Sequence, residues 1–415
     1  MLKTLIKKWV FLLLIIIFNL IIALRTSIGI FYLFFWFLIT TIAISLLFIT
    51  LQYLGAGLNL SRKVVGKIEE DDFSEIELLV NNEGFLPLFN VVLEDYLSPA
   101  IPEERKKRVL LNYLGAQSSL NIKYSCQCPL RGKYIIDPLV VYFFDPLGLV
   151  FLKKTYTLNS ELYVYPKTFR IQKFPPLVKG VLPWFGIGTR RVSGDEDEFY
   201  GVREYKDGDP IKKIHWFSSA RKNMLIVKEF QCQSFSRATI MFNLEKALNF
   251  GEGKESVAEY SIKIAASVAK YLMEKGVSLE IIAHTEQIAH LPFNRGAEHL
   301  EDTLRFLAVA QPESQISLAE MFQEFSRYIP DDSNLIVIMS DRDWECLPVM
   351  LALEKRNICL IPLILISSTF LYSGDKQREI VDYVKFKLSG AFNFNPILFS
   401  RGENPEEVFL KYHER

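Results

Sequence analysis

The residue types that could do chemistry gather most densely in one stretch, residues 199–230. Near its middle, residues 207–210 read Asp-Gly-Asp-Pro, a turn in which glycine supplies backbone freedom and proline fixes φ. The alternating run that closes the stretch predicts a strand. Its candidate functional positions are Arg203, Glu204, Tyr205, Gly208, Asp209, His215, Trp216, Ser219 and Arg221.

This stretch matches no catalytic motif. No nucleophile stands in an elbow sequence, and the chain has no Walker, dinucleotide-binding or H-E-x-x-H pattern. Two interpretations stay open. In the first, the stretch is a structural plug in which Asp209 or Glu204 holds Arg221 by two parallel bonds, with Trp216 packed beneath the pair. In the second, the same residues form a binding surface for a protein partner.

The order of these residues resembles the signature of the domain of unknown function 58 family. That signature reads roughly R-E-Y-x-x-G-D-x-x-R-x-I-x-W-x-x-S-A-R, followed by a V-x-x-F strand. The chain departs from it at Lys212 and His215, where the family usually has Arg and Asp. The matching positions are Arg203, Glu204, Tyr205, Gly208, Asp209, Ile214, Trp216, Ser219, Ala220, Arg221, Val227 and Phe230.

Beyond the signature, apolar strands alternate with helices, which predicts a mainly parallel sheet covered on both faces. The resemblance implies that residues 238–415 form a von Willebrand factor A-like α/β (Rossmann-type) domain. We expect strands at 238–244, 278–283, 289–293, 334–339 and 358–366, and helices at 256–275, 298–309, 318–328, 347–355 and 378–388.

Ligands of such sheets bind beyond the carboxyl ends of the strands, where residues 243–247 and 341–343 lie. The resemblance implies a divalent-ion site there, built from D-x-S-x-S, a Thr and a later Asp. This chain instead reads N-L-E-K-A, although Asp341 keeps the later position. Mg²⁺ needs several oxygen ligands in good geometry. Asn243, Glu245 and Asp341 therefore form a degenerate site. These three residues still offer three oxygen atoms to Mg²⁺, which is the alternative, but we expect no metal and no other cofactor.

Residues 58–166 carry short alternating runs separated by turn residues, which predicts an all-β sandwich of immunoglobulin type. The resembled family has an R-G-x-Y strand and a D-P-x-G-L turn in this region. These appear here at residues 131–134 and 145–149. Residues 167–198 contain prolines, glycines and an acidic cluster, and we expect a linker that leads to the signature segment, residues 199–237.

The N-terminal residues 1–57 hold two apolar runs, separated by Arg25-Thr26-Ser27. The second run exceeds the roughly 20 residues that a spanning helix needs, and the first is close to the lower limit of about 17. A cleaved signal peptide is the alternative for the first run, but no small-residue cleavage site follows it. Positive charges flank the pair on both outer sides, so we expect a transmembrane helical hairpin in the cell membrane with both termini and the soluble domains in the cytoplasm. The flanking cations are Lys3, Lys7, Lys8, Arg62, Lys63 and Lys67.

Composition excludes one broad class. The 415 residues carry a net charge of zero, which argues against a nucleic-acid binder that relies on a basic surface. The five cysteines are spread along the chain and are expected to be reduced packing residues.

Three functions are compatible with these features. The first is a non-enzymatic membrane-anchored assembly factor that binds a protein partner, and the resemblance implies a MoxR-type AAA+ ATPase acting in complex maturation or envelope processes. The second is a metal-dependent hydrolase that uses Asp209, Glu245, Asp341 and His215. The third is a purely structural membrane scaffold.

Overall fold

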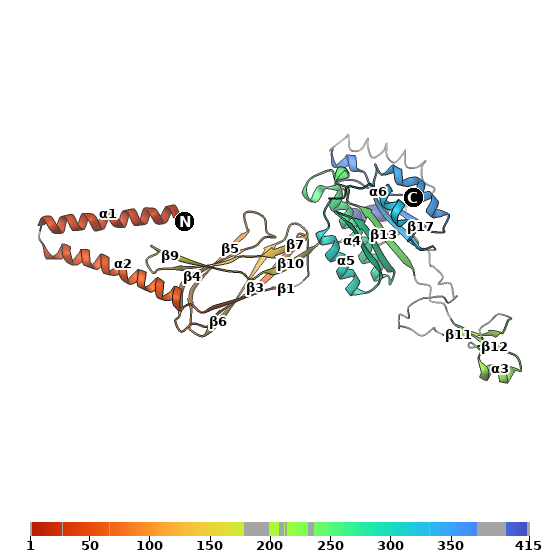
Figure 1. The fold of residues 1–415 in the computed structure, drawn as a ribbon, viewed down its shortest axis with the longest axis horizontal. Coiled ribbons are helices and arrows are strands. Elements are labelled where there is room, and N and C mark those ends of the chain that lie inside the picture. Colours follow the sequence, from red (N-terminus) through yellow and green to blue (C-terminus); the bar gives the residue numbers. More distant parts are fainter. Residues whose placement is uncertain are drawn as a thin grey trace. The chain divides into compact units, whose positions relative to one another are not determined.

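The computed structural model describes residues 2–26, 28–65, 67–177, 199–206, 211, 214–230, 236–331, 333–371 and 396–412. The chain divides into two compact units, Met1–Lys167 and Thr168–Arg415. In Figure 1 the first unit runs from red to yellow, and the second from green to blue.

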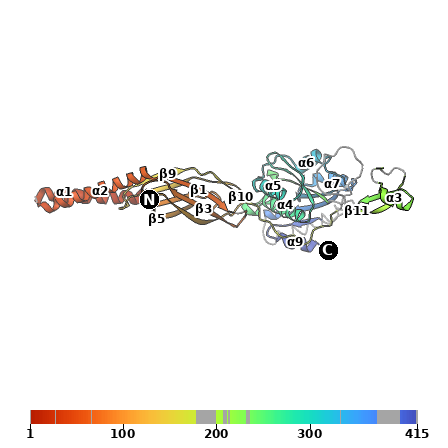
Figure 2. The ribbon, with the colours of Figure 1, turned by 90° about the horizontal axis from the view of Figure 1, so that it is seen from below.

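The first unit begins with two long apolar helices, α1 (Leu2–Thr26) and α2 (Gly29–Gly55), as predicted. Both are long and apolar enough to cross a membrane. Within their apolar windows 6% and 11% of the residues are buried, which distinguishes them from the core helices of a soluble domain. The two helices lie side by side as a hairpin in both ribbon views (Figures 1 and 2).

The strands that follow form a sandwich of antiparallel sheets, as the alternating runs predicted. One sheet has the order β1-β3-β6 and the other the order β5-β4-β8-β9. Alternate side chains of β3, including Leu78 and Val80, enter the core between the sheets. The strands are β1 (Leu58–Val65), β3 (Phe73–Asn82), β4 (Leu88–Tyr96), β5 (Lys106–Leu114), β6 (Ser118–Gln127), β8 (Leu139–Phe144) and β9 (Phe151–Tyr156).

A third small sheet joins β2 (Ile68–Glu69), β10 (Ser160–Tyr165) and β7 (Gly132–Ile136). The apolar stretch 134–144 is divided between β7 and β8. Asp137-Pro138 causes the break, because proline lacks the N–H that a ladder position requires. Cys126 and Cys128 are free and buried in this part of the sandwich.

The last turns of α2 are part of the sandwich core. Ile49 is 1% exposed and packs in the same cluster as Phe143 of β8. The amide of Gln52 is oriented to accept a hydrogen bond from the backbone N of Phe89 (2.7 Å) and to donate one to its carbonyl oxygen (3.2 Å). Helix α2 and the sandwich are therefore one packed body.

The second unit contains a six-stranded sheet of order β15-β14-β13-β16-β17-β18. All its neighbouring pairs are parallel except β14 with β15. Every residue of β16 is buried, which is typical of a central parallel strand covered on both faces. The strands are β13 (Arg237–Asn243), β14 (Ser278–His284), β15 (Ile288–Asn294), β16 (Asn334–Ser340), β17 (Cys359–Leu365) and β18 (Ile397–Phe399).

Helices cover both faces of this sheet (Figure 1). Helices α4 (Val257–Glu274), α5 (Ala297–Val309) and α9 (Pro405–Tyr412) contribute to the core on one face, and α6 (Leu318–Phe325) and α7 (Leu347–Glu354) to the core on the other.

One predicted helix of this unit is shorter in the structure, and another cannot be compared with it. Helix α6 begins at a capping box of Ser317 and Glu320, but it ends at Phe325 rather than Tyr328, shortly before Pro330. The expected helix at 378–388 lies outside the described residues.

Candidate functional site

The signature stretch folds into a small unit. Strand β11 (Phe199–Glu204) pairs antiparallel with β12 (Ile226–Phe230), and helix α3 (Trp216–Lys222) lies between them in the sequence. The helix is capped by His215, whose Nδ1 accepts a hydrogen bond from the backbone N–H of Ser218 (3.0 Å). It ends at Asn223, which adopts the left-handed conformation with φ 57°. Histidine thus provides the cap that the family's usual aspartate would also provide.

Ser219 holds this unit together. It is 7% exposed, and its hydroxyl donates to the carbonyl oxygen of His215 (3.0 Å) and accepts from the backbone N–H of Ile226 (2.9 Å). The hydroxyl therefore ties α3 to β12. These two bonds give the signature serine a structural role.

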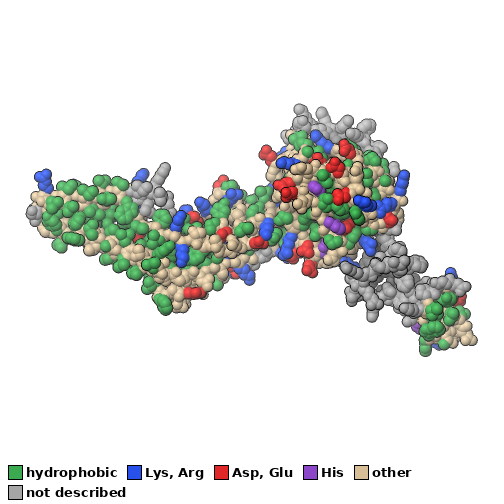
Figure 3. Space-filling view, in the orientation of Figure 1, with side chains coloured by type: hydrophobic (Ala, Val, Ile, Leu, Met, Phe, Trp, Pro, Cys, Tyr) green, Lys and Arg blue, Asp and Glu red, His purple; other side chains and the backbone are tan. Residues whose placement is uncertain are grey.

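The apolar side chains around Ser219 point outwards. Trp216 is 63% exposed and Phe217 is 77% exposed. The expectation that Trp216 packs beneath an ion pair is therefore wrong, because too little of its ring is covered. Figure 3 shows hydrophobic side chains gathered on this unit. The exposed apolar residues that we call the signature face are Val202, Ile211, Trp216, Phe217, Met224 and Leu225.

The other signature residues lie in or directly after strand β11, in helix α3 or outside the described residues. Arg203 and Glu204 lie in β11 opposite β12, and Tyr205 follows them, with its backbone N–H donated to the carbonyl oxygen of Leu225 (2.9 Å). Arg221 lies in α3 and is exposed. Gly208 and Asp209 lie outside the described residues, and with them the expected pair of Asp209 and Arg221.

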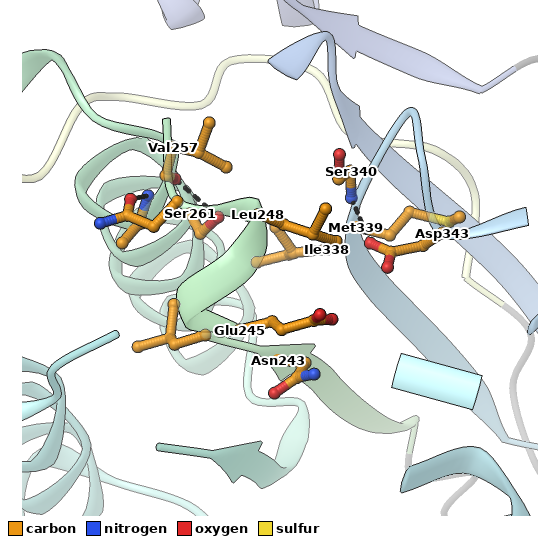
Figure 4. A pocket seen from close by; sticks show the side chains of 12 residues that line it. Asn243, Glu245, Leu248, Val257, Ser261, Ile338, Met339, Ser340 and Asp343 are labelled. Carbon is orange, nitrogen blue, oxygen red and sulfur yellow. Dashed lines mark hydrogen bonds between the residues drawn. The ribbon is translucent and has the colours of Figure 1, made fainter. Parts of the chain in front are cut away.

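A second candidate site lies at the carboxyl ends of β13 and β16, where the sheet topology predicted one. A small pocket opens there, with Asn243 and Glu245 from the end of β13 on one side and Ser340 and Asp343 on the other (Figure 4). Ile338 and other apolar side chains form part of its lining. The pocket therefore combines an apolar wall with oxygen atoms from two strand ends.

Its acidic residue beyond β16 is Asp343. The sequence pointed instead to Asp341, and the structure corrects this. The Oδ1 atom of Asp341 accepts hydrogen bonds from the backbone N–H (2.9 Å) and the hydroxyl (2.5 Å) of Ser367, which holds it to the segment after β17. Asp343 curls back so that its Oδ2 accepts from the backbone N–H of Ser340 (2.7 Å). The sequence placed residues 341–343 at this strand end, but spacing alone does not show which of the two aspartates lines the pocket.

Burial raises the pKa values of both acids in the pocket. For Asp343, burial together with the nearby carboxylates of Glu245, Asp341 and Glu345 raises the pKa to about 6, against the opposing hydrogen bond from Ser340. For Glu245, burial is again the largest cause of a raised pKa.

Asn243 stands where the family's usual aspartate would, and one atom of its amide is anchored. Its Nδ2 donates to the carbonyl oxygen of Ile316 (2.6 Å), and within the described part of the chain its buried Oδ1 has no hydrogen-bond partner. Among the described residues, no group of three or more His, Cys, Asp or Glu side chains is arranged to hold a metal ion.

Of the four residues proposed for a metal-dependent hydrolase, the three that the structure describes each have different neighbours. The cap of α3 uses Nδ1 of His215, and Ser367 uses the carboxylate of Asp341. Glu245 lies in the pocket with Asp343, and Asp209 lies outside the described residues.

These features define a protein class: an apolar helical hairpin, an antiparallel β-sandwich and an α/β unit that carries a small exposed signature. Residues 201–348 match the family model described as "Protein of unknown function DUF58". The chain therefore carries a domain of this family, as its signature predicted.

One curated protein is similar to this chain, and its name states no activity. The chain is 25% identical over 231 residues to the uncharacterized protein YeaD of Bacillus subtilis (strain 168), which covers 54% of this chain and 55% of that protein. The chain thus spans about half the length of this curated relative.

Two solved structures resemble parts of the chain. The CARDB domain of the PF1109 protein from Pyrococcus furiosus, solved in complex with di-metal ions, has a TM-score of 0.20 and 15% identity, covering 26% of this chain and 93% of that one. Proximal thread matrix protein 1 from the mussel byssus has a TM-score of 0.25 and 14% identity, covering 32% of this chain and 38% of that one. At these scores the likenesses carry no conclusion about fold or function.

Proposed function

We propose that this chain is a non-enzymatic, membrane-anchored interaction factor that binds a protein partner through the signature face. The supporting observation is the exposure of Trp216 and Phe217, which present two neighbouring aromatic rings to solvent. Exposed apolar patches on folded proteins mark interaction sites, and tryptophan is among the residues that contribute most to binding energy.

The proposed anchor is the hairpin of α1 and α2, embedded in the cell membrane with both ends in the cytoplasm. Its length and apolar composition support this, as do the lysines in the first turns of α1. The α/β unit is proposed to be a von Willebrand factor A-like domain that binds without metal, with the N-L-E-K-A sequence after β13 as the reason.

The proposed partner is a MoxR-type AAA+ ATPase that acts in complex maturation or envelope processes. This partner comes from the family resemblance alone. We place the contact with this ATPase at the signature face, so substitutions of single residues there can test the proposal.

The test measures affinity of the purified full chain for the MoxR-type ATPase of the same cell. Trp216→Ala and Phe217→Ala should each weaken binding by about tenfold or more, because truncating a central aromatic anchor costs at least about 2 kcal/mol. The matched control is Tyr328→Ala, an aromatic residue of the α/β unit that is 66% exposed. It should bind as the wild type does.

The competing outcomes are distinct. Equal loss in all three variants would contradict a specific signature face. Wild-type binding that neither Trp216→Ala nor Phe217→Ala weakens would place the contact elsewhere. No binding of the wild type would remove this ATPase as partner and favour a purely structural membrane scaffold.

A further inference from the structure

The turn between β8 and β9, residues 145–150, is built around one buried carboxylate. Asp145 is 2% exposed and accepts hydrogen bonds from the backbone N–H groups of Leu147 (3.1 Å) and Val150 (2.7 Å). Its Oδ2 also accepts from the hydroxyl of Ser45 in α2 (2.5 Å). This D-P-L-G-L turn is therefore held rigidly against the second helix.

The first helix contacts the same turn. The indole Nε1 of Trp9 donates to the carbonyl oxygen of Leu149 (2.7 Å), and Nζ of Lys8 donates to that of Gly148 (3.4 Å). Lys8 and Trp9 on α1 and Ser45 on α2 therefore lie at the same height along the helical hairpin, beside the 145–150 turn.

The remaining length of each helix fits a bilayer. From Trp9 to Arg25, and from Gly29 to Ser45, each helix extends for about 17 residues, which at 1.5 Å per residue is about 25 Å. This is close to the shortest length that spans a hydrocarbon core of about 30 Å. A tryptophan and a lysine at this level are typical of the membrane–water interface.

We propose that the 145–150 turn is a lipid-contact site, in which the Leu147 side chain enters the headgroup–acyl boundary of the bilayer. Leu147 is 46% exposed, although Asp145 and Leu149 on either side of it are buried (2% and 7% exposed). Interfacial apolar groups insert about 5–10 Å at this boundary, and Lys8 beside the turn faces the lipid phosphates. The inference rests on the membrane anchoring proposed above.

The test places a photoreactive benzophenone side chain at one position at a time in the full chain. The protein is reconstituted in nanodiscs of phosphatidylcholine and phosphatidylglycerol and irradiated. Lipid adducts are then detected by intact-protein mass spectrometry. Position 147 is the test, and Phe34 of α2, 46% exposed, is the positive control. Leu130, 43% exposed, is the matched negative control. It follows β6 at the end of the sandwich opposite α2, because Ser118 at the start of β6 pairs with the strand end nearest the helices.

We expect lipid adducts at positions 34 and 147, and at least about fivefold fewer at 130, because only the first two positions lie within the depth that lipid chains and headgroups reach. Adducts at 147 as rare as at 130, with position 34 labelled, would overturn the lipid-contact site and leave the anchor intact. No lipid adducts at position 34 would overturn the anchor itself. Crosslinks from 147 to a second copy of the chain instead of lipid would show that this turn is a protein interface and would also overturn the inference.

Discussion

The carboxyl group of Asp343 lines the small pocket beyond β13 and β16, and its raised pKa predicts a pH dependence of stability. The folded-state pKa of about 6 lies above the ordinary value of 3.8. The native state therefore binds a proton more tightly than the unfolded state, so the free energy of unfolding should rise as pH falls from 6 to about 4 and drop again as pH rises. The gain should be on the order of 1–3 kcal/mol.

Asp343→Asn should remove this pH dependence. The amide oxygen can still accept the hydrogen bond from Ser340, but no charge is buried at neutral pH. Chemical denaturation at pH 4.5 and pH 7.5 should show a smaller difference for this variant than for the wild type. If the difference in the free energy of unfolding between the two pH values is the same in the variant and the wild type, another group causes the pH dependence.

Asp341 has a different task, and its replacement should act independently of metal. Asp341→Ala leaves the backbone N–H and hydroxyl of Ser367 without their acceptor, which should cost about 1–3 kcal/mol. The decrease in melting temperature should be the same with and without Mg²⁺. A Mg²⁺-dependent increase in the wild type that disappears in the variant would show a working metal site.

At the scale of elements, the signature unit separates a structural residue from a surface residue. Arg221→Ala should change stability by no more than about 0.5 kcal/mol, because Arg221 is exposed, and should weaken partner binding. Ser219→Ala should lower stability by about 1–3 kcal/mol, because it removes the acceptor of the Ile226 N–H. Thermal unfolding of the full chain provides the comparison. If Arg221→Ala lowers the melting temperature as much as Ser219→Ala does, Arg221 has a structural role and the binding-surface interpretation is wrong.

Elements with a strong pattern were predictable, and those shaped by local contacts were not. Helix α4 and strand β16 appear close to their expected bounds, because a helical apolar face and a continuous apolar run are direct consequences of burial. The exposure of Trp216 was not predictable, because an aromatic residue in a dense motif suits a core and a binding face equally well. The place of Asp343 depends on a turn that closes back on Ser340, and spacing alone does not encode such a turn.

At the scale of the whole molecule, the hairpin predicts a topology. Positive charges on both outer flanks should keep the two termini and the soluble units in the cytoplasm. Protease added to sealed cells should leave the C-terminal part of the chain intact. The same protease added to inverted membrane vesicles should digest that part. Digestion in sealed cells would contradict both this topology and a cytoplasmic partner.

The order of the helical hairpin, the sandwich and the α/β unit was also predictable from the sequence. How much of α2 packs into the sandwich was not. Composition alone assigns all 27 residues of this helix to an apolar span. The structure shows that Ser45, Ile49 and Gln52 belong to the sandwich, through contacts made with strands far along the chain. Only the fold reveals that the last part of this apolar run packs into the sandwich.

The packing of Gln52 and Ile49 into the sandwich has a mechanical consequence. The junction between α2 and β1 has no free hinge, so α2 and the sandwich turn together as a stiff arm. A spanning helix tilts when the bilayer becomes thinner than its apolar length. Any such tilt of α2 would swing the far end of the sandwich through the same angle, so that bilayer thickness would set the direction in which this arm points.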